Sequence, residues 1–425
     1  MRILMLSDVY FPRVNGVSTS IQTYRRDLLG LGHQCTLIAP EYPTGAVPVR
    51  AAADPADVLR VASRRVPRDP EDRAMSRRRL LSLLPLLRER NYDVLHIQTP
   101  FLAHYGGLQL ARGLDVPVVE SYHTYFEHYL HHYVPGIPAA LTRWLARRVT
   151  VSQCSQVQAV IAPSEPMARA LRDYGVRTRI EVLPTGLPPE SFERGDGARF
   201  RHAHSIAPSR PVALFVGRVA HEKNIDFLLQ MLVPLRHRVP DALLIVAGEG
   251  PAVDHLKNLA TRLGLQTHVL FLGYMDRRRE LPDCYAAADA FVFASRTETQ
   301  GLVLLEALAQ GTPVVATAVM GTVDVLRGAR GAVVVQEDSA EFSAALAEVL
   351  QDRTRRAALA AGALHDAQRW SSLALAQRLI ALYESVTTAH SGRRNVERRP
   401  PPGAAESAIG GIALPAAPPA RRGVA

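Results

Sequence analysis

Short apolar runs alternate with amphipathic helical segments along most of the chain. Val17, Ile21, Tyr24, Leu28 and Leu31 recur at helical spacing, so they would form one apolar stripe on a helix. Short apolar runs between such helices are typical of strands that are buried on both faces of a parallel sheet. In the first half of the chain, the predicted strands are residues 2–9, 35–39, 93–97, 117–121 and 157–162.

The alternation lapses at residues 184–209, where glycine and proline accumulate, and then resumes. The second set of predicted strands comprises residues 212–216, 243–247, 269–272, 290–293 and 313–316. From residue 391 the chain is rich in Pro, Gly, Ala and Arg without periodicity, which is typical of disorder. We therefore predict a domain at 1–185, a linker at 186–209, a second domain at 210–370, a helix returning to the first domain at 371–388, and a disordered tail at 389–425.

Length and composition indicate a soluble globular protein. The 425 residues suffice for two or three domains, and 47% apolar with 21% charged residues excludes wholesale disorder and fibrous classes. Three scattered cysteines without a C-x-x-C pair argue against a disulfide scaffold and favour a reducing compartment. The first apolar run is too short for a signal peptide, and no stretch suits a membrane span. We therefore expect a cytoplasmic location.

The balance of charge is basic, with 50 Lys plus Arg against 40 Asp plus Glu, a formal net charge of +10. An anionic partner is one explanation, and an ordinary solvated surface is the other. Nucleic acid is the less favoured partner, because no recognised binding module is present.

Residues 63–90 form an Arg-rich stretch with leucines at helical spacing. The default interpretation is a surface helix that packs its leucines on the core. The functional alternative is an interfacial helix on an anionic membrane. The leucines are Leu80, Leu81, Leu83, Leu84 and Leu87. A second candidate membrane patch consists of Arg143, Trp144, Arg147 and Arg148.

The segment that begins at Ser295 carries the strongest chemical signal. Glu298 and Glu306 lie eight positions apart, one before and one within a predicted helix. Backbone N–H groups at a helix start can bind anions or sugar hydroxyls. Here these groups belong to Thr299, Gln300, Gly301 and Leu302. A carboxylate can accept two hydrogen bonds from a ribose diol. A buried Glu306 needs a ligand or an ion pair, whereas a capping or solvated carboxylate is the structural alternative.

Two further loops carry candidate phosphate ligands. In residues 216–224, Arg218 and Lys223 flank a loop between a strand and a helix, so both cations can converge on one diphosphate. Two exposed surface cations are the alternative. In residues 10–18, Gly16 opens the first helix, where the choice is between a phosphate contact and a plain turn.

Together these segments resemble the retaining nucleotide-sugar glycosyltransferases of the GT-B fold, in the large family called family four. The resemblance covers residues 1–388 and rests on the E-x7-E pattern of Glu298 and Glu306, on Gly-Arg…Glu-Lys-Asn at 217–224, and on Gly-Thr-Pro-Val-Val at 311–315. It implies an α/β fold of two Rossmann-like domains that face a central cleft. The first domain would bind the acceptor and the second the nucleotide sugar.

The resemblance also implies roles for single residues. Glu306 would bind the ribose, and Glu298 would face the donor sugar. The implied catalytic residues are His123, Arg218, Lys223 and Glu298. The implied donor-binding residues are Gly16, Gly248, Glu249, Thr299, Gln300, Gly301, Leu302 and Glu306. The implied acceptor residues are Tyr122, His123 and Tyr125.

The chain departs from the family pattern at Gln300, where most members have Phe. The form Thr-Glu-Thr-Gln-Gly at 297–301 is similar to that of the glycolipid-forming members, whose acceptors are diacylglycerol-type lipids. The resemblance therefore favours a membrane lipid as the acceptor and the inner face of the plasma membrane as the place of reaction.

No metal or other cofactor is expected. The sequence has no Asp-x-Asp pair, so the metal-bridged diphosphate of the other glycosyltransferase architecture has no obvious ligands, and Arg218 and Lys223 would replace the metal. His128 and His132 are four positions apart and are an alternative zinc pair, although an acceptor-site wall is the favoured interpretation of this aromatic stretch.

The predicted function is retaining, metal-independent transfer of a hexose from a nucleotide diphosphate sugar to an acceptor hydroxyl. The donor stays open among UDP-glucose, UDP-galactose and GDP-mannose, because base selection depends on backbone contacts. A sugar-nucleotide epimerase and a catalytically silent, membrane-associated scaffold are the alternative functions. The intact pair of Glu298 and Glu306 argues against the silent protein.

Overall fold

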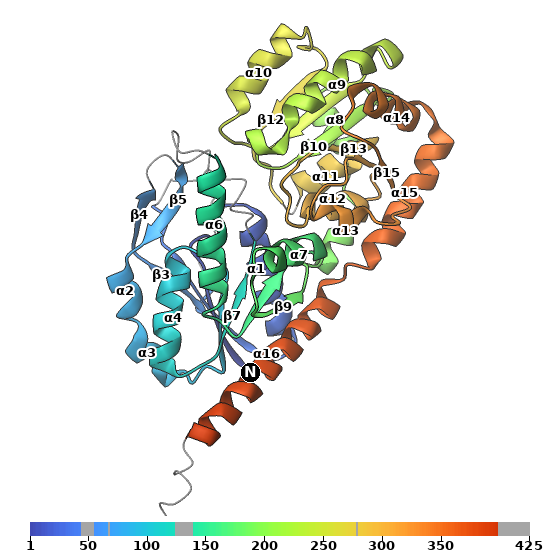
Figure 1. The fold of residues 1–425 in the computed structure, drawn as a ribbon. Helices are drawn as coiled ribbons and strands as arrows, with labels where there is room; N and C mark the ends of the chain where they lie inside the picture. The colour runs from blue at the N-terminus through green and yellow to red at the C-terminus, as the bar shows by residue number, and fades with distance from the viewer. Residues whose placement is uncertain (44–54, 67–68, 124–138, 278, 398–425) are drawn as a thin grey trace, which may run out of the picture.

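The computed structural model describes residues 1–43, 55–66, 69–123, 139–277 and 279–397. These residues form two α/β domains, each built on a parallel sheet with helices on both faces (Figure 1). The mostly parallel architecture predicted from the alternating pattern is confirmed.

The N-terminal sheet has seven parallel strands in the order β3-β2-β1-β6-β7-β8-β9. Its strands are β1 (Arg2–Leu6), β2 (Gln34–Pro40), β3 (Val58–Val61), β6 (Val94–Ile97), β7 (Val118–Ser121), β8 (Ala159–Ala162) and β9 (Arg179–Val182). Among the described residues, the helices of this domain are α1 (Gly16–Gly30), α2 (Arg77–Leu81), α3 (Leu84–Glu89), α4 (Leu102–Leu114), α6 (Ala139–Cys154) and α7 (Glu165–Asp173).

The apolar runs form strands because both faces of this sheet are covered. Along β1, Leu4 belongs to one buried cluster and its neighbours Ile3 and Met5 to another. Successive side chains point to opposite faces of a strand. A strand that is buried on both faces must therefore be apolar throughout.

Helix α16 (Ser372–Glu397) starts at the end of the second domain and lies along the first (Figure 1). Leu379 and Tyr383 of α16 are fully buried in the same cluster as Ile3 of β1. The helix continues past residue 388, into the segment predicted to be a disordered tail. Residues 398–425 of that predicted tail lie outside the described residues.

The second sheet has six parallel strands in the order β12-β11-β10-β13-β14-β15. Its strands are β10 (Val212–Val216), β11 (Leu243–Ala247), β12 (Val269–Leu272), β13 (Ala290–Phe293), β14 (Val314–Ala316) and β15 (Ala332–Val334). The helices of this domain are η2 (His221–Lys223), α9 (Ile225–Arg238), α10 (Val253–Arg262), α11 (Glu280–Ala287), α12 (Leu302–Ala309), α13 (Thr322–Leu326), α14 (Ser339–Gln351) and α15 (Arg353–Gln368).

The segment predicted as a linker contains two helices, η1 (Pro189–Phe192) and α8 (Gly197–Ala203). Helix α8 buries Phe200 and packs on α11. A Cβ at Gly195 or Gly197 would lie within 2.5 Å of α11 backbone oxygens, at Pro282 and Ala286 respectively. These glycines therefore serve close packing as well as turning the chain.

The Arg-rich stretch at 63–90 is not one amphipathic helix, which corrects the helical alternative. Its first half is an antiparallel hairpin of β4 (Ser63–Val66) and β5 (Asp69–Met75), and α2 and α3 follow. Leu80 and Leu87 are fully buried, and Leu80 and Leu84 lie against Gly106 and Gly113 of α4. The leucine stripe therefore packs on the core, as the default interpretation predicts.

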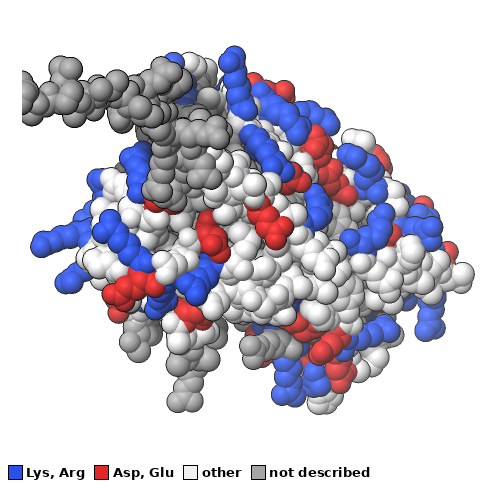
Figure 2. Space-filling model, turned by 90° about the horizontal axis from the view of Figure 1, so that it is seen from below, with Lys and Arg blue, Asp and Glu red and all other residues white. Residues whose placement is uncertain are grey.

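Charged side chains of both signs share the lower face of the molecule. Lys and Arg lie between Asp and Glu on this face, around an uncharged central area (Figure 2). The net charge of +10 is therefore not gathered there into one continuous basic field.

Candidate functional site

The carboxyl ends of the two sheets are in contact. The Thr299 hydroxyl, in the loop before α12, donates to the carbonyl oxygen of His123 after β7 at 3.2 Å. The Ser164 hydroxyl after β8 donates to the Thr299 carbonyl at 2.7 Å, and Ser164 is also the N-cap of α7. Because ligands of open parallel sheets bind beyond the carboxyl ends of the strands, this junction is the candidate site.

Lys223 and Glu298 form an ion pair at this junction, with 2.5 Å between Lys223 Nζ and Glu298 Oε1. Both side chains are largely buried. Lys223 ends η2, and the following Asn224 has a left-handed conformation and donates from Nδ2 to the carbonyl of Ala294 at 3.1 Å. Local backbone geometry therefore fixes the cation against the end of β13.

Arg218 lies on the same loop as Lys223, directly after β10. Its Nη1 is 3.9 Å from Glu222 Oε1, and its side chain is partly exposed. The two predicted diphosphate ligands thus flank one loop at the carboxyl end of the second sheet.

The neighbouring loop after β11 packs closely on this one. Gly248 has φ +133°, and a Cβ on it would lie 2.0 Å from the Gly217 carbonyl oxygen. Glycine is therefore required there. The carboxylate of Glu249 lies against Gly273 at the end of β12, since a Cβ on Gly273 would be 3.0 Å from Glu249 Oε1. Gly248 and Glu249, two of the predicted donor-binding residues, therefore lie next to the residues that follow β10 and β12.

Glu306 is paired within the second domain. Helix α12 begins at Leu302, after Gly301 at φ +91°, and the partly buried carboxylate of Glu306 follows one turn later. It forms an ion pair with Arg277 and accepts a hydrogen bond from the Tyr285 hydroxyl at 2.9 Å. The Glu306 charge raises the pKa of Arg277, and burial raises that of Tyr285 well above its ordinary value.

Arg277 is a site residue that the sequence reasoning missed. It stands in the loop after β12, within a run of arginines at 277–279 that has no distinguishing pattern. A signal existed in the requirement that a buried Glu306 have a partner, but the spacing could not say which cation supplies it.

The Gln300 side chain lies at the domain junction. It accepts from Thr185 N–H at 2.8 Å and donates to the Thr185 carbonyl at 2.7 Å. The Thr185 hydroxyl is in turn hydrogen-bonded to Ser20 of α1 at 2.7 Å. The position where most family members have Phe thus connects the loop of Glu298 to the segment that joins the domains.

Gly16 opens α1 at the carboxyl end of the first sheet, after Asn15, whose side chain caps the helix by accepting from Ser18 N–H at 2.8 Å. Among the described residues, apart from its chain neighbours and the backbone of its own helix, no atom lies within 4 Å of the position that a Cβ on Gly16 would occupy. The helix start predicted to contact phosphate is therefore open.

His123 and His96 are two neutral histidines behind the junction. His123 Nε2 is 3.3 Å from Gln98 Oε1, and desolvation lowers the pKa of His123 to about 4. The fully buried His96 is hydrogen-bonded to Ser121 and to the hydroxyl of Tyr383, and burial lowers its pKa to about 3.

Of the other two predicted acceptor residues, the structure describes only Tyr122. Tyr122 is buried in the core, where its hydroxyl is hydrogen-bonded to Thr150 of α6 at 3.0 Å. This placement corrects the expectation that its side chain lines the acceptor site. Tyr125 lies outside the described residues, as do His128 and His132 of the alternative zinc pair.

Two family models match the chain in succession. "Glycosyltransferase Family 4" matches residues 14–191, and "Glycosyl transferases group 1" matches residues 197–365. An alpha-monoglucosyldiacylglycerol synthase of Streptococcus pneumoniae is 34% identical over 74% of this chain and 71% of the relative. A GDP-mannose-dependent alpha-mannosyltransferase of Mycolicibacterium smegmatis is 30% identical over 93% of this chain and 99% of the relative.

The chain belongs to the family 4, group 1 glycosyltransferases.

Solved structures share the fold of this glycosyltransferase. Anabaena HepE in complex with UDP-glucose has a TM-score of 0.70 at 19% identity, covering 91% of this chain and 100% of that one. Sucrose-phosphate synthase from Thermosynechococcus elongatus has a TM-score of 0.72 at 20% identity, covering 92% and 100%. The GT-B fold expected from the resemblance is thus confirmed, and the comparisons do not support the epimerase alternative. Among the described residues, no helix of the glycosyltransferase is long and apolar enough to cross a membrane.

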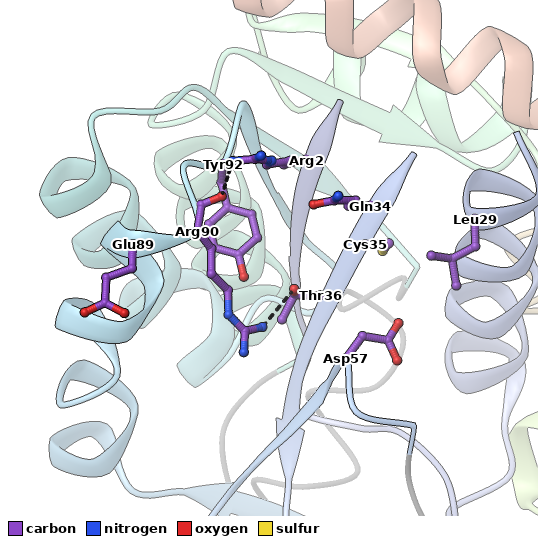
Figure 3. A pocket seen from close by; sticks show the side chains of 9 residues that line it. All are labelled: Arg2, Leu29, Gln34, Cys35, Thr36, Asp57, Glu89, Arg90 and Tyr92. Atoms are coloured by element: carbon purple, nitrogen blue, oxygen red, sulfur yellow. Dashed lines mark hydrogen bonds between the residues drawn. The ribbon is translucent and has the colours of Figure 1, made fainter. Parts of the chain in front are cut away.

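A cavity of about 670 Å³ lies away from the junction, at the amino ends of β1 and β2 (Figure 3). Arg2 and Gln34, the first residues of these strands, line it together with Arg90, whose Nη1 donates to the Thr36 hydroxyl at 3.4 Å. Burial raises the pKa of the lining Cys35 thiol to about 12, so it is not a nucleophile at neutral pH. The cavity opens at the amino ends of the strands, whereas the candidate glycosyltransferase site lies at their carboxyl ends.

Proposed function

We propose that this glycosyltransferase transfers glucose or mannose, with retention, from a nucleoside diphosphate sugar to a hydroxyl of a diacylglycerol-type lipid. The observation that carries the proposal is the Lys223–Glu298 pair, next to Arg218, at the junction of two carboxyl sheet edges. The pair brings a cation for the leaving diphosphate and a carboxylate for the sugar to one point.

Donor binding would rearrange both acidic partners. A diphosphate carries more negative charge than one carboxylate, so it would compete for Lys223 and free Glu298 to accept from sugar hydroxyls. The ribose diol would likewise replace part of the contact of Glu306 with Arg277 and Tyr285. Occupied ion pairs in the free enzyme thus keep these buried charges compensated until the donor supplies new partners.

In the reaction, the bond between the sugar C1 and the phosphate oxygen breaks, and the acceptor oxygen bonds to C1 from the same face. The acceptor proton passes to the departing phosphate oxygen. Arg218 and Lys223 stabilise the charge that develops on the diphosphate, which is the part that a metal ion plays in other architectures. Glu298 is paired with Lys223 and acts on the sugar hydroxyls, not as a covalent nucleophile.

His123 would act as a neutral imidazole. With its pKa lowered to about 4, it carries no charge at neutral pH and can exchange hydrogen bonds with a sugar hydroxyl. The ring nitrogen that does not face Gln98 is the one available for this contact. If His123 were charged, it would be a third cation beside Arg218 and Lys223 and would slow release of the diphosphate product. A neutral His123 avoids this.

The lipid acceptor is supported by the names of the relatives. Both the Streptococcus pneumoniae relative and one from Acholeplasma laidlawii, 27% identical over 74% of this chain, are alpha-monoglucosyldiacylglycerol synthases. The GDP-mannose-dependent relatives match more of the chain. The donor therefore stays a choice between glucose and mannose nucleotides.

Helix α6 offers the better membrane surface of the two candidate patches. Its large apolar side chains are exposed, with 53% for Leu141, 54% for Trp144, 48% for Leu145 and 42% for Val149. Leu80 and Leu87 of the competing stretch are buried. Large apolar residues on one helix flank, including Trp, suit the interfacial region of a bilayer.

The charges on α6 suit an anionic leaflet. The helix contains three arginines and no Asp or Glu. Arg148 stacks over the Trp144 ring at 5.1 Å, so cation and aromatic are held together. The buried side of α6 contacts the carboxyl end of β7, next to His123, through the hydrogen bond between Tyr122 and Thr150. Docking of α6 at the inner face of the plasma membrane would bring that edge close to lipid hydroxyls.

The test is transfer by the purified full chain with UDP-glucose, UDP-galactose and GDP-mannose, each with vesicles containing diacylglycerol and with soluble sugars. We expect an α-linked glycolipid from one donor. Lys257→Ala, which removes an exposed cation on α10 away from the site, should form the same product at the same rate. Transfer restricted to soluble sugars would refute the lipid acceptor, and a β-linked product would refute retention.

A further inference from the structure

Two histidines and one aspartate from three different elements converge at the Arg218–Lys223 loop. His221 begins η2, Asp226 lies in the first turn of α9, and His255 lies on α10. His255 Nε2 is 2.5 Å from Asp226 Oδ1, and the two imidazole rings are 5.3 Å apart. One ligand atom from each residue lies within 4.8 Å of the other two.

The backbone holds the elements of this cluster in place. Val219 N–H donates to the Glu249 carbonyl at 2.8 Å, and Ala252 N–H donates to the Val219 carbonyl at 3.0 Å. A Cβ on Gly250 would lie 2.3 Å from the Val219 carbonyl oxygen, so the two loops touch through backbone. The separation of His221 and His255 is therefore set by the fold, and side-chain rotation alone adjusts the ligand atoms.

The three side chains that would bind the ion determine which class of metal is favoured. Imidazole nitrogens favour zinc and related transition metals, whereas magnesium and calcium require oxygen ligands. Zinc–nitrogen distances of about 2.1 Å in a tetrahedron place the ligand atoms about 3.4 Å apart, which small rotations of these partly exposed side chains can reach. Two histidines and a carboxylate leave one position for water.

We propose that His221, Asp226 and His255 bind a divalent transition-metal ion of the zinc class. The ion would tie η2 to α9 and α10. Because Lys223 is the last residue of η2, binding would restrict the loop that carries this cation without taking part in the reaction. The site is therefore separate from the metal-independent transfer proposed above.

The experiment titrates the EDTA-stripped, desalted full chain with ZnCl2 by calorimetry, with MgCl2 as the ion that should not bind. We expect saturable zinc binding that His255→Ala and Asp226→Asn each weaken at least tenfold, because even outer-shell partners contribute about 10–100-fold to metal affinity. His237→Ala, which removes an exposed histidine of α9, should leave the affinity unchanged.

Thermal unfolding separates loss of the site from loss of the fold. We expect zinc to raise the melting temperature of the wild type and of His237→Ala but not of His255→Ala, while the metal-free proteins melt together. Unchanged zinc affinity in a His221→Ala/His255→Ala double variant would refute the proposal and leave an ordinary surface ion pair. Equal binding of magnesium would refute the assigned class of ion.

Discussion

The Gln300 side-chain amide forms two hydrogen bonds with the backbone of Thr185, accepting from its N–H at 2.8 Å and donating to its carbonyl at 2.7 Å. Both groups are buried, and the pair links the loop before α12 to the end of the first domain. Two residues before Gln300 stands Glu298. The geometry of the domain junction and the position of the carboxylate are therefore coupled.

Replacement of Gln300 should affect both stability and turnover. Gln300→Leu leaves the Thr185 N–H and carbonyl groups buried without partners, at about 1–3 kcal/mol for each group. We expect a lower free energy of unfolding and a lower kcat, since the loop of Glu298 loses its anchor. Urea denaturation and steady-state kinetics measure the two effects. Gln266→Leu, at an exposed position, is the control, and equal behaviour of the two variants would contradict the anchoring role.

Arg218→Ala and Lys223→Ala should each lower kcat by about 10²–10³-fold, the usual cost of removing one electrostatic donor to a developing anion. Lys257→Ala, an exposed cation on α10, should keep wild-type turnover. Circular dichroism of each variant checks that the fold survives. Near-wild-type turnover in both site variants would contradict the proposal that this loop binds the diphosphate.

Treatment with EDTA should leave turnover largely intact, because side-chain cations serve the leaving diphosphate. The measurement compares initial rates before and after chelation at saturating donor. Abolition of activity by EDTA, with restoration by one divalent ion, would contradict metal independence. A change in thermal stability without a change in rate would agree with a metal at His221, Asp226 and His255.

Membrane binding should depend on α6 more than on the Arg-rich stretch before it. Burial of a large apolar side chain contributes about 1.5–3 kcal/mol, so Trp144→Ser with Leu145→Ser should weaken cosedimentation with anionic vesicles at least tenfold. Arg77→Ser, Arg78→Ser and Arg79→Ser together form the comparison variant. We expect it to lose less binding than the α6 variant, because these three arginines lie on α2 and not on the surface proposed to dock. Equal binding to neutral and anionic vesicles would show that attraction between arginines and anionic lipid does not contribute to membrane binding.

Acid should destabilise the protein through His96. Its pKa is about 3 in the folded state and about 6.5 when unfolded, so the unfolded chain binds more protons between these values. Stability contributed by the neutral ring is present above about pH 6.5 and falls as the pH drops, by about 1.4 kcal/mol per unit. Urea denaturation at several pH values should show a shallower dependence for His96→Gln than for the control His237→Gln. Parallel curves would contradict burial of a neutral imidazole.

The sequence by itself determined most strands of the two sheets and the chemical residue types, although β3, β9 and β15 were not among the predicted strands. The apolar runs at 212–216, 243–247, 269–272 and 290–293 coincide with strands, and Ser164 caps its helix, because periodicity and capping depend on residues close in the chain. Glu298 and Glu306 could be singled out for the same reason, since their spacing is local.

Only the tertiary structure decided the partners. The ion pair of Arg277 with Glu306, the anchoring of Gln300 by Thr185 and the burial of Tyr122 each join segments far apart in the chain. The Arg-rich stretch similarly divides into a hairpin and two short helices, and the leucines of these helices pack against glycines on α4. Such contacts follow from how the sheets and helices pack. A local sequence pattern does not show which distant segment will pack against it.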